Sequence, residues 1–420
     1  MTPGPSLVEI FLVALRLGCT SFGGPVAHLA FFRQEYVVKR RWLDEAHYAD
    51  LVALCQFLPG PASSQTGFGI GFLQRGLAGG LAAWLGFTLP SAILMFGFAY
   101  GVATLGHLET AGWLKGLKVA AVAVVAQAVW SMGRSLCPDL PRSILAGASA
   151  GVLLMLPQVG SQVAVIAAGA VIGWWFLDVG SLPRDKLGAL SPSNGLVGGP
   201  SAKPGPATSA GPTAGLPYLI TFFILLLGLP VLAHVTGNPA VEILDRFYRA
   251  GSLVFGGGHV VLPLLEREVV APGWVTHDQF LAGYGAAQAV PGPLFTLSAF
   301  LGTVMTHGPA HSTGSGRGGW IGGLWALLAI FLPALLLVAG ALPFWQVLRH
   351  RPVAQAALRG ANAAVVGVLL AALYHPVGTA GITNGRTLGL AVAGFVALQW
   401  GRIPAWAVVG TAAALGAGLL

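Results

Sequence analysis

Charged side chains are scarce in this 420-residue chain, in which Asp, Glu, Lys and Arg together make up 9% of the residues. Soluble domains carry roughly 25% charged residues, so a soluble enzyme, a DNA-binding protein and a disordered chain are all excluded. Hydrophobic residues reach 55%, and the mean hydropathy is +0.76. The core of a bilayer favours this composition because each ionisable group there costs several kcal/mol. The sequence therefore predicts an all-α polytopic membrane protein.

Cysteine and acidic residues are also few. The three cysteines, Cys19, Cys55 and Cys137, have neither metal-ligand spacing nor the even number of a closed disulfide framework. The 22 Lys and Arg residues outnumber 14 acidic residues, and in membrane proteins this excess belongs to cytoplasmic loops rather than to a nucleic-acid surface. Met1–Ser6 lacks the basic segment of a signal peptide and is expected to belong to the mature protein. We expect no metal, no cofactor and no direct use of ATP, since no Cys/His cluster and no Walker A sequence occur.

The chain contains an internal repeat. Arg16-x-Gly18-x3-Phe22-Gly23-Gly24 recurs 233 residues later as Arg249-x-Gly251-x3-Phe255-Gly256-Gly257, and Glu35 recurs at the same spacing as Glu268. Further matches follow in the same order: Trp42 with Trp274, Gln56-x-x-Pro59-Gly60-Pro61 with Gln288-x-x-Pro291-Gly292-Pro293, Pro90 with Pro333, and Leu114-Lys115-Gly116 with Leu358-Arg359-Gly360. This agreement indicates a duplicated unit, which is a common plan of secondary transporters.

A segment rich in Gly, Pro, Ser and Ala divides the two copies. Residues 188–216 are expected to form a flexible cytoplasmic linker between an N-terminal repeat, residues 1–187, and a C-terminal repeat, residues 217–420. The apolar run Tyr218–Val235 has no counterpart in the first half. It predicts one extra transmembrane helix that leads the second repeat.

The placement of basic residues predicts how each half is inserted in the membrane. Arg33–Arg41 holds four basic side chains and is expected in the cytoplasm, whereas its counterpart Glu266–His277 keeps one arginine and is expected outside. At the next pair of equivalent loops the second half has the basic residues instead. His107–Glu109 has no Lys or Arg, while its counterpart has Arg349 and Arg351. We therefore expect repeats of inverted topology, with the N-terminus and the linker in the cytoplasm.

Each half is interrupted twice, at a Phe-Gly-Gly sequence and at a Pro-Gly-Pro turn. Proline lacks the backbone donor that a continuing helix needs, and a full span needs about 20 apolar residues. Asp50–Leu58 and Ala62–Leu73 are therefore each expected to be a half-helix of a re-entrant hairpin. Val119–Met132, Ile144–Leu156 and Gln162–Leu177 predict short transmembrane helices.

The helix starts after these interruptions are candidates for anion binding, since they present free N–H groups and the positive end of a helix dipole. Hydroxyl and amide side chains follow the two turns: Ser63, Ser64, Gln65 and Thr66 in the first half, and Thr296 and Ser298 in the second. Two repeats would bring such starts together near the midplane. The alternative is that Gly and Pro merely permit close helix packing. Repetition of both interruptions in register favours the binding site.

Residues around the interruptions complete the candidate site. Gln56 and Gln288 precede the turns, where an amide can either cap freed carbonyls or touch the substrate, and both interpretations stay open. The candidate substrate-binding residues are Arg16, Phe22, Gly23, Gly24, Pro25, Gln56, Pro59, Gly60, Pro61, Ser63, Ser64, Arg249, Phe255, Gly256, Gly257, Gln288, Pro291, Gly292, Pro293 and Thr296.

Four matched charges lie near the interruptions. Arg16 and Arg249 are candidates to face an anion, because an arginine within a membrane defaults to a functional hypothesis. The alternative is that Arg16 extends to the interface or pairs with Glu35. Glu35 and Glu268 are candidates for proton coupling if burial raises their pKa, or for structural pairing at the membrane face. We favour the pairing, with Arg33 and Arg267 among the partners.

These motifs resemble the bacterial chromate transporter family in its long bidomain form. The resemblance rests on Arg16-x-Gly18-x3-Phe22-Gly23-Gly24-Pro25, on Gln56-x-x-Pro59-Gly60-Pro61 and on their copies, and it covers nearly the whole chain outside Gly188–Gly215. The second half departs where Gly258 replaces Pro25. The resemblance implies efflux of chromate, chromate resistance and a location in the bacterial cytoplasmic membrane.

Other functions remain as alternatives. Sulfate or another tetrahedral oxyanion is the second expected cargo, and a channel is an alternative to a carrier. A membrane-embedded hydrolase or acyltransferase would need a nucleophile and a base, such as Ser63 or Ser64 with His28, but neither pairing has a copy in the second half. We therefore expect a transporter and not an enzyme, with the lipid bilayer as its environment. A homodimer is one oligomeric state that the sequence permits.

Overall fold

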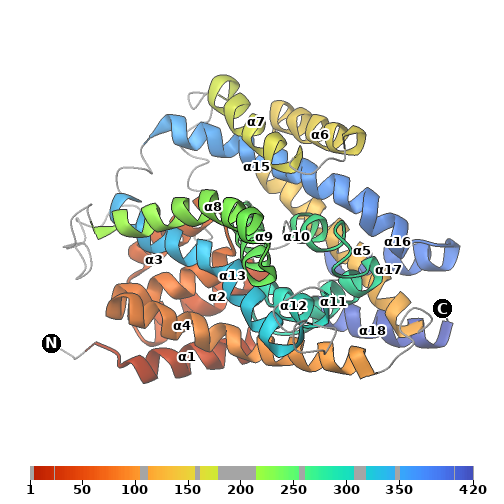
Figure 1. Ribbon diagram of the computed structural model, residues 1–420, viewed down its shortest axis with the longest axis horizontal. Coiled ribbons are helices and arrows are strands. Elements are labelled where there is room, and N and C mark those ends of the chain that lie inside the picture. Colours follow the sequence, from red (N-terminus) through yellow and green to blue (C-terminus); the bar gives the residue numbers. More distant parts are fainter. Residues whose placement is uncertain are drawn as a thin grey trace.

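Every regular secondary-structure element among the described residues is a helix. The computed structural model describes residues 4–22, 24–104, 112–156, 161–177, 214–254, 261–306, 318–345, 351–401 and 403–419. Within these ranges the elements are helices and no strand occurs (Figure 1). Five described helical segments are long and apolar enough to cross a membrane: Ala62–Val102, Gly112–Leu136, Leu216–Thr236, Gly319–Phe344 and Val353–Gly381. The prediction of an all-α polytopic membrane protein is confirmed.

The helices of the first half follow the predicted interruptions. They are α1 (Leu7–Thr20), α2 (Gly24–Phe32), the π-helix η1 (Arg33–Lys39), α3 (Glu45–Phe57), α4 (Ala62–Thr104), α5 (Gly112–Leu136), α6 (Leu140–Met155) and α7 (Ser161–Phe176). Asp44 starts α3 because its carboxylate accepts the His47 N–H at 2.8 Å. Within α4 the helix is interrupted at Arg75 and Gly76, where Gly76 has φ +60°. The first arm of α4 therefore coincides with the predicted segment Ala62–Leu73.

The second half repeats this order. After α8 (Leu216–Thr236) come α9 (Pro239–Ser252), α10 (Val261–Val269), α11 (His277–Ala289), the 3₁₀ turn η8 (Leu294–Thr296), α12 (Leu297–Val304), α13 (Gly319–Ala341), η10 (Leu342–Phe344), α15 (Pro352–Ala372), the π-helix η11 (Leu373–Gly378), α16 (Thr379–Gly381), α17 (Gly385–Gln399) and α18 (Ala405–Leu419). The predicted short helix Val119–Met132 is longer than expected, because α5 extends it at both ends to 25 residues.

The last helices of the two halves are exchanged. α18, from the second half, packs along α5 of the first half, and α7 of the first half packs along α15 of the second (Figure 1). Small residues permit the close approach at equivalent places, since Gly116 lies against the backbone of Ala412 and Gly360 lies against that of Gly169. The halves therefore form one body rather than two separate bundles.

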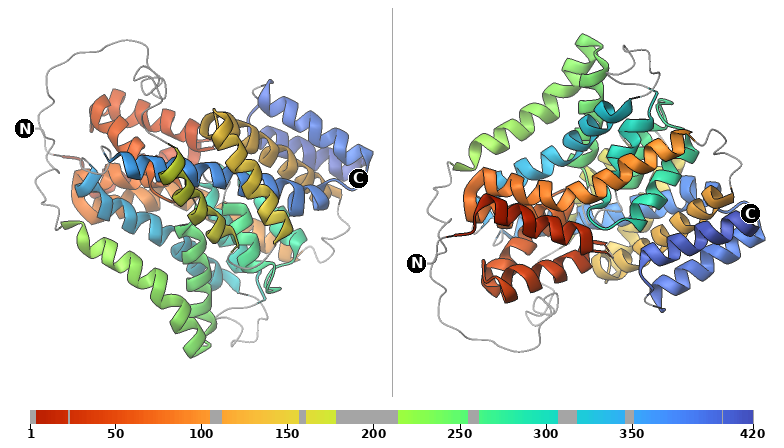
Figure 2. Two further views of the ribbon diagram at one scale, coloured as in Figure 1. Left: turned by 90° about the horizontal axis from the view of Figure 1, so that it is seen from above. Right: turned by 90° about the horizontal axis from the view of Figure 1, so that it is seen from below.

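α8 lies at the edge of this body, as Figure 2 shows. It packs on α9 and α13, yet only 11% of its most apolar window is buried. An apolar helix with this little burial suits a lipid-facing position. The predicted extra helix Tyr218–Val235 coincides with it. Most of the predicted linker lies outside the described residues, and α8 begins at its last residue, Leu216.

Candidate functional site

Both predicted interruptions are present in each half. α1 ends at Thr20 and α2 begins at Gly24, which has φ +81°. In the second half α9 ends at Ser252 and α10 begins at Val261. Gly23, the side chain of Pro25, and Phe255, Gly256 and Gly257 lie outside the described residues. The Pro-Gly-Pro turns separate α3 from α4 and α11 from η8.

The turn of each half is hydrogen-bonded to the interruption of the other half. The Gly60 N–H donates to the Val254 carbonyl at 2.6 Å, and the Gly292 N–H donates to the Ser21 carbonyl at 3.0 Å. Gly60 and Gly292 are repeat mates, and so are Ser21 and Val254. We call these four residues the central junction. Each turn therefore lies against the interruption of the opposite half.

Glycine is needed at both turns for two physical reasons. Gly60 has φ +130° and Gly292 has φ +99°, a backbone conformation that side chains disfavour. A Cβ atom on Gly60 would lie 2.8 Å from the Ala334 Cβ, and one on Gly292 would lie 2.8 Å from the Ser91 Oγ. Because Ala334 belongs to the second half and Ser91 to the first, each turn is pressed against a helix of the opposite half.

The polar residues after the first turn are buried at the start of α4. Ser63, Ser64, Gln65 and Thr66 are each at most 2% exposed. The Thr66 hydroxyl donates to the Ala62 carbonyl at 2.8 Å, and the Gln65 Nε2 donates to the Pro59 carbonyl at 2.8 Å. The Ser64 Oγ and the Gln65 Oε1 have no hydrogen-bond partner among the described residues. The predicted polar cluster is thus buried and only partly satisfied.

The equivalent residues of the second half are satisfied within their own turn. The Thr296 hydroxyl donates to the Pro293 carbonyl at 2.9 Å, and the Ser298 hydroxyl donates to the Phe295 carbonyl at 2.7 Å. Both residues are fully buried. The two helix starts are therefore not equivalent in the hydrogen bonds that they leave free.

Three further predicted residues have side chains with other surroundings. Gln56 is exposed on α3, and Gln288 shares a hydrogen bond with the buried Tyr284. Phe22 follows α1 and packs against Trp406 of α18, with ring centroids 6.2 Å apart. Of these three side chains, Phe22 contacts another helix and Gln288 bonds within α11.

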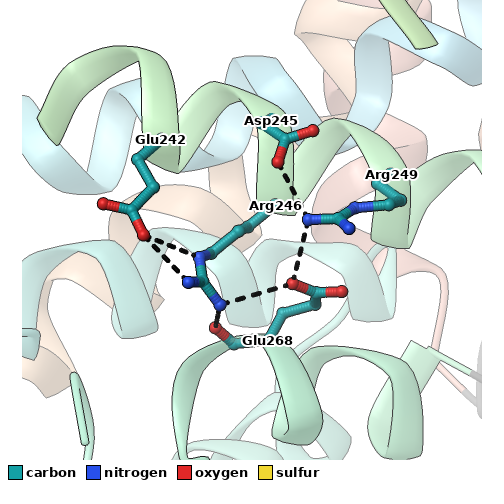
Figure 3. A network of polar contacts seen from close by, with 5 residues as sticks. All are labelled: Glu242, Asp245, Arg246, Arg249 and Glu268. Atoms are coloured by element: carbon teal, nitrogen blue, oxygen red, sulfur yellow. Dashed lines mark hydrogen bonds and ion pairs between the residues drawn. The ribbon is translucent and has the colours of Figure 1, made fainter. Parts of the chain in front are cut away.

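Arg16 and Arg249, although repeat mates, have different surroundings. The Arg16 side chain is exposed on α1, and the described part of the chain offers it no ion pair. The Arg249 guanidinium donates to the Asp245 carboxylate at 2.8 Å and contacts that of Glu268 at 3.4 Å (Figure 3). Two carboxylates thus offset the charge of Arg249, whereas that of Arg16 is available to an anion.

The glutamates pair with other arginines than expected. Arg33 forms an ion pair with Glu45 at 2.6 Å, while Glu35 pairs with Arg40 at 3.0 Å and with Lys39 at 3.3 Å. The predicted Glu35–Arg33 pair is therefore wrong, because residues two apart on a helix do not face each other.

Arg40 joins two carboxylates of the first half. It also donates to Glu9 at 2.7 Å, and its guanidinium lies over the Trp42 ring at 5.5 Å. We call Glu9, Glu35, Arg40 and Trp42 the first clasp. It ties α1 to the end of η1.

The second half contains a matching arrangement, whose charged residues are drawn in Figure 3. Arg246 donates to Glu242 at 2.8 Å, contacts the Glu268 carboxylate at 3.6 Å and lies over the Trp274 ring at 4.6 Å. We call Glu242, Arg246, Glu268 and Trp274 the second clasp. A cavity of about 300 Å³ opens beside it, lined in part by Gln162 and Arg267.

The two repeat-related glutamates differ in pKa. Burial raises the pKa of Glu35, but hydrogen bonds from Arg40 and Lys39 outweigh it, so the pKa lies below its usual range. Burial raises the pKa of Glu268, and here Arg249 and Arg246 offset the effect only in part. The longer contacts of Glu268, at 3.4 and 3.6 Å, explain the weaker compensation.

The clasps include four residues that the sequence reasoning missed: Glu9, Arg40, Glu242 and Arg246. Glu9 and Glu242 are also 233 residues apart, so extending the repeat toward the N-terminus finds this pair. The two arginines occupy unrelated repeat positions, and spacing alone does not find them.

Comparison with known proteins agrees with this architecture. Residues 8–174 and 241–417 match the model of a family described as chromate transporter. A chromate transport protein of Pseudomonas aeruginosa is 29% identical over 336 residues, which cover 79% of this chain and 72% of that protein. A chromate transport protein of Cupriavidus metallidurans is 24% identical over 379 residues, or 88% of this chain and 82% of that protein. No solved structure matches the chain significantly.

Proposed function

Because the chain belongs to the chromate transporter family, we propose that it is a secondary transporter that exports chromate across the bacterial cytoplasmic membrane and so confers chromate resistance. The family match over both halves is the observation that carries this proposal. Sulfate, another tetrahedral dianion, is the alternative cargo. The transport step needs no covalent chemistry from the chain.

The central junction supports a substrate site between the halves. The helix starts at Gly24 and Ala62 follow two of the interruptions, and each start presents N–H groups that favour an anion. The buried polar residues at the start of α4 provide further donors. Arg16, exposed on α1, adds a positive charge that attracts the anion toward the site.

The reciprocal contacts support an inverted arrangement of the repeats. A hydrogen bond from Gly60 to Val254 and its mate from Gly292 to Ser21 form the isologous pattern of a two-fold axis within one chain. The opposite balance of basic residues in the equivalent loops favours an axis in the membrane plane. α8 supplies the odd crossing that this topology requires. The N-terminus, the linker and the first clasp then face the cytoplasm, and the second clasp faces outward.

The same arrangement suggests how the anion moves. The repeat units are residues 1–187 and 217–420, and because α7 and α18 are exchanged between them, the rocking parts are the two groups of packed helices that contain the exchanged helix. Their movement about the central junction alternately opens the first-clasp side and the second-clasp side. The cavity beside the second clasp, bordered by Arg246 and Arg267, serves as the outer vestibule. Glu268 and Glu35 hold structural positions in the clasps and carry no proton in this mechanism.

The membrane potential is sufficient to drive export. One charge that crosses 100 mV changes its energy by about 2.3 kcal/mol, so a dianion that leaves a negative-inside cell gains about 4.6 kcal/mol. Uptake of the same dianion would need coupled protons or cations. We therefore propose export driven by the potential alone.

Everted vesicles test this function directly. Vesicles that contain the protein should accumulate radiolabelled chromate when their interior is made positive, and valinomycin with high potassium should abolish the accumulation. Vesicles from cells that lack the protein provide the control. Undiminished accumulation without a potential, but sensitive to nigericin, would contradict the proposed driving force and indicate proton coupling. Stronger transport of sulfate than of chromate would identify the alternative cargo.

A further inference from the structure

Unsatisfied polar atoms gather in the first half of the molecule. Among the described residues, these buried side-chain atoms of the first half have no hydrogen-bond partner: Ser21 Oγ, His28 Nδ1, Ser64 Oγ, Gln65 Oε1, Trp84 Nε1 and Thr88 Oγ1. Each residue is at most 8% exposed. A buried polar group without a partner costs about 1–3 kcal/mol. A group of them on neighbouring helices is therefore a candidate site for a polar ligand.

Several of these atoms lie beside the central junction. Trp84, Thr88 and Ser91 are spaced four and three residues apart, so they share one face of α4. That face meets the second half, because the Trp84 ring packs on Phe331 at 5.5 Å and Ser91 lies against the turn at Gly292. Ser21 joins the same place through its carbonyl, which accepts the Gly292 N–H.

The fold of α4 brings Ser64, on its first arm, toward Trp84 and Thr88 on its second arm. α4 turns back at Arg75–Gly76, and Gly71 on the first arm lies against Gly79 and Ala83 on the second. Ser64 is seven residues before Gly71, and seven residues beyond Gly79 and Ala83 lie Gly86 and Pro90, which flank Thr88. Figure 1 shows α1 and α4 side by side, with α12 and α13 next to them.

Among the described residues, the second half lacks free donors at the equivalent positions; its buried unpartnered donors, Arg249 Nε and Trp345 Nε1, occupy other repeat positions. The repeat mates of Ser21, Trp84 and Thr88 are apolar: Val254, Leu327 and Phe331. The mate of Ser64 is Thr296, and its hydroxyl is already bonded to the Pro293 carbonyl. The backbone hydrogen bonds of the junction are therefore repeated in both halves. The unpartnered hydroxyl and indole donors beside it belong to the first half.

We propose that Ser21, Ser64, Trp84 and Thr88 form a single site for a dehydrated tetrahedral oxyanion, held by neutral hydrogen bonds on the first-half side of the central junction. This inference rests on the proposed function and specifies its substrate site. Three hydroxyls, an indole N–H and the free N–H groups at the start of α4 supply donors without a charged side chain. Gln65 Oε1 can only accept a hydrogen bond, so it is not a ligand.

Neutral donors suit a carrier for two reasons. A charged arginine buried in the membrane interior would cost several kcal/mol whenever no anion is bound to offset its charge. Conduction also requires an anion to be held firmly enough to enter and weakly enough to leave. Arg16 then attracts the anion from outside the site, and Arg249 stabilises the fold through Asp245 and Glu268.

Two substitutions, of which Thr88→Val is isosteric, test the site in the full chain, reconstituted in liposomes. Thr88→Val removes a hydroxyl and Trp84→Phe removes the indole N–H, and each should raise the KM for chromate and for sulfate about tenfold. Thr88→Ser should restore the wild-type KM. The control is Thr303→Val, the same chemical change at a buried second-half hydroxyl that donates to the Ala299 carbonyl; its KM should be unchanged.

Equilibrium binding of radiolabelled sulfate to the purified protein gives a second measurement. One sulfate per chain is expected, with affinity lowered in Thr88→Val and kept in Thr303→Val. Two sulfates per chain, or wild-type KM in both Thr88→Val and Trp84→Phe, would overturn the inference and leave the proposed function intact. A wild-type protein that transports neither chromate nor sulfate would instead refute the proposed function.

Discussion

The central junction and the two clasps are built from the same duplicated sequence, yet they repeat in different ways. At the junction the two hydrogen bonds, Gly60 to Val254 and Gly292 to Ser21, are equivalent to each other in the repeat. In the clasps the carboxylates and the tryptophans are repeat-equivalent, but the bridging arginine is not. It comes from Arg40 after η1 in the first half, and from Arg246 on α9 in the second.

This difference shows which contacts the duplicated backbone imposes. A main-chain hydrogen bond at a close crossing depends on the chain path, so both halves must make it in the same way. A clasp needs only a guanidinium that reaches two carboxylates, and a long side chain can do so from several positions. Arg246 has the buried Val13 as its repeat mate, which confirms that the arginine position is free to vary.

Substitutions that disrupt the central junction should lower the free energy of unfolding most. Gly60→Ala and Gly292→Ala each add a Cβ at a positive φ and within 2.8 Å of the opposite half, so each should lower stability by about 2–5 kcal/mol. Gly60→Ala should cost more, because the Ala334 Cβ is fixed while the Ser91 hydroxyl can rotate. Thermal unfolding in detergent, followed by size-exclusion chromatography, measures both.

Gly76→Ala is the matched control for the junction variants. Gly76 also has a positive φ, +60°, but open space surrounds its Cβ position, so only backbone strain of about 1 kcal/mol is expected. Ala334→Gly should partly rescue Gly60→Ala by removing the contacting methyl group. Equal losses in Gly60→Ala and Gly76→Ala would show that the halves are not in close contact at the turn.

Breaking the clasps should have an intermediate effect. Arg40→Ala and Arg246→Ala each leave carboxylates without their bridging partner, and each should cost about 1–3 kcal/mol in the same unfolding assay. Substitution by Lys should recover part of the loss, because an ammonium keeps the charge but cannot bridge as a planar fork. Arg33→Ala, which breaks an exposed pair with Glu45, is the control and should change little. A full recovery with Lys would show that charge alone stabilises the clasp.

The sequence predicted the fold well because its signals are local or periodic. Composition indicated the membrane, the repeat indicated the duplicated order of helices, and the Pro-Gly-Pro turns placed the starts of α4 and η8. The partners in the ion pairs were harder to predict. Helical spacing separates Arg33 from Glu35, and no local pattern shows that Arg40 returns to Glu9.

The candidate site was predictable only in part. The buried serines after Pro61 follow directly from the interrupted helix, whereas Thr88 and Trp84 join the region only because α4 folds back at Gly76. Which turn meets which interruption also depends on the exchange between the halves. A repeat detected in sequence does not reveal whether its copies pack side by side or across one another.

The pH dependence of the clasps should have the smallest effect and gives the sharpest comparison. The pKa of Glu35 lies below 4.5, so its ionised form stabilises the fold at neutral pH and this contribution disappears as the pH falls through the lowered value. The pKa of Glu268 lies above 4.5, so its ionised form opposes folding at neutral pH, and acidification relieves this cost. At pH 7, Glu35→Gln should therefore lower the Tm, while Glu268→Gln should keep or raise it, with both differences within about 1 kcal/mol. Both should shrink toward acidic pH when unfolding is measured across a pH series. A lower Tm for Glu268→Gln at pH 7 would show that its ion pairs outweigh its burial, and the two clasps would then be energetically alike despite their different arginines.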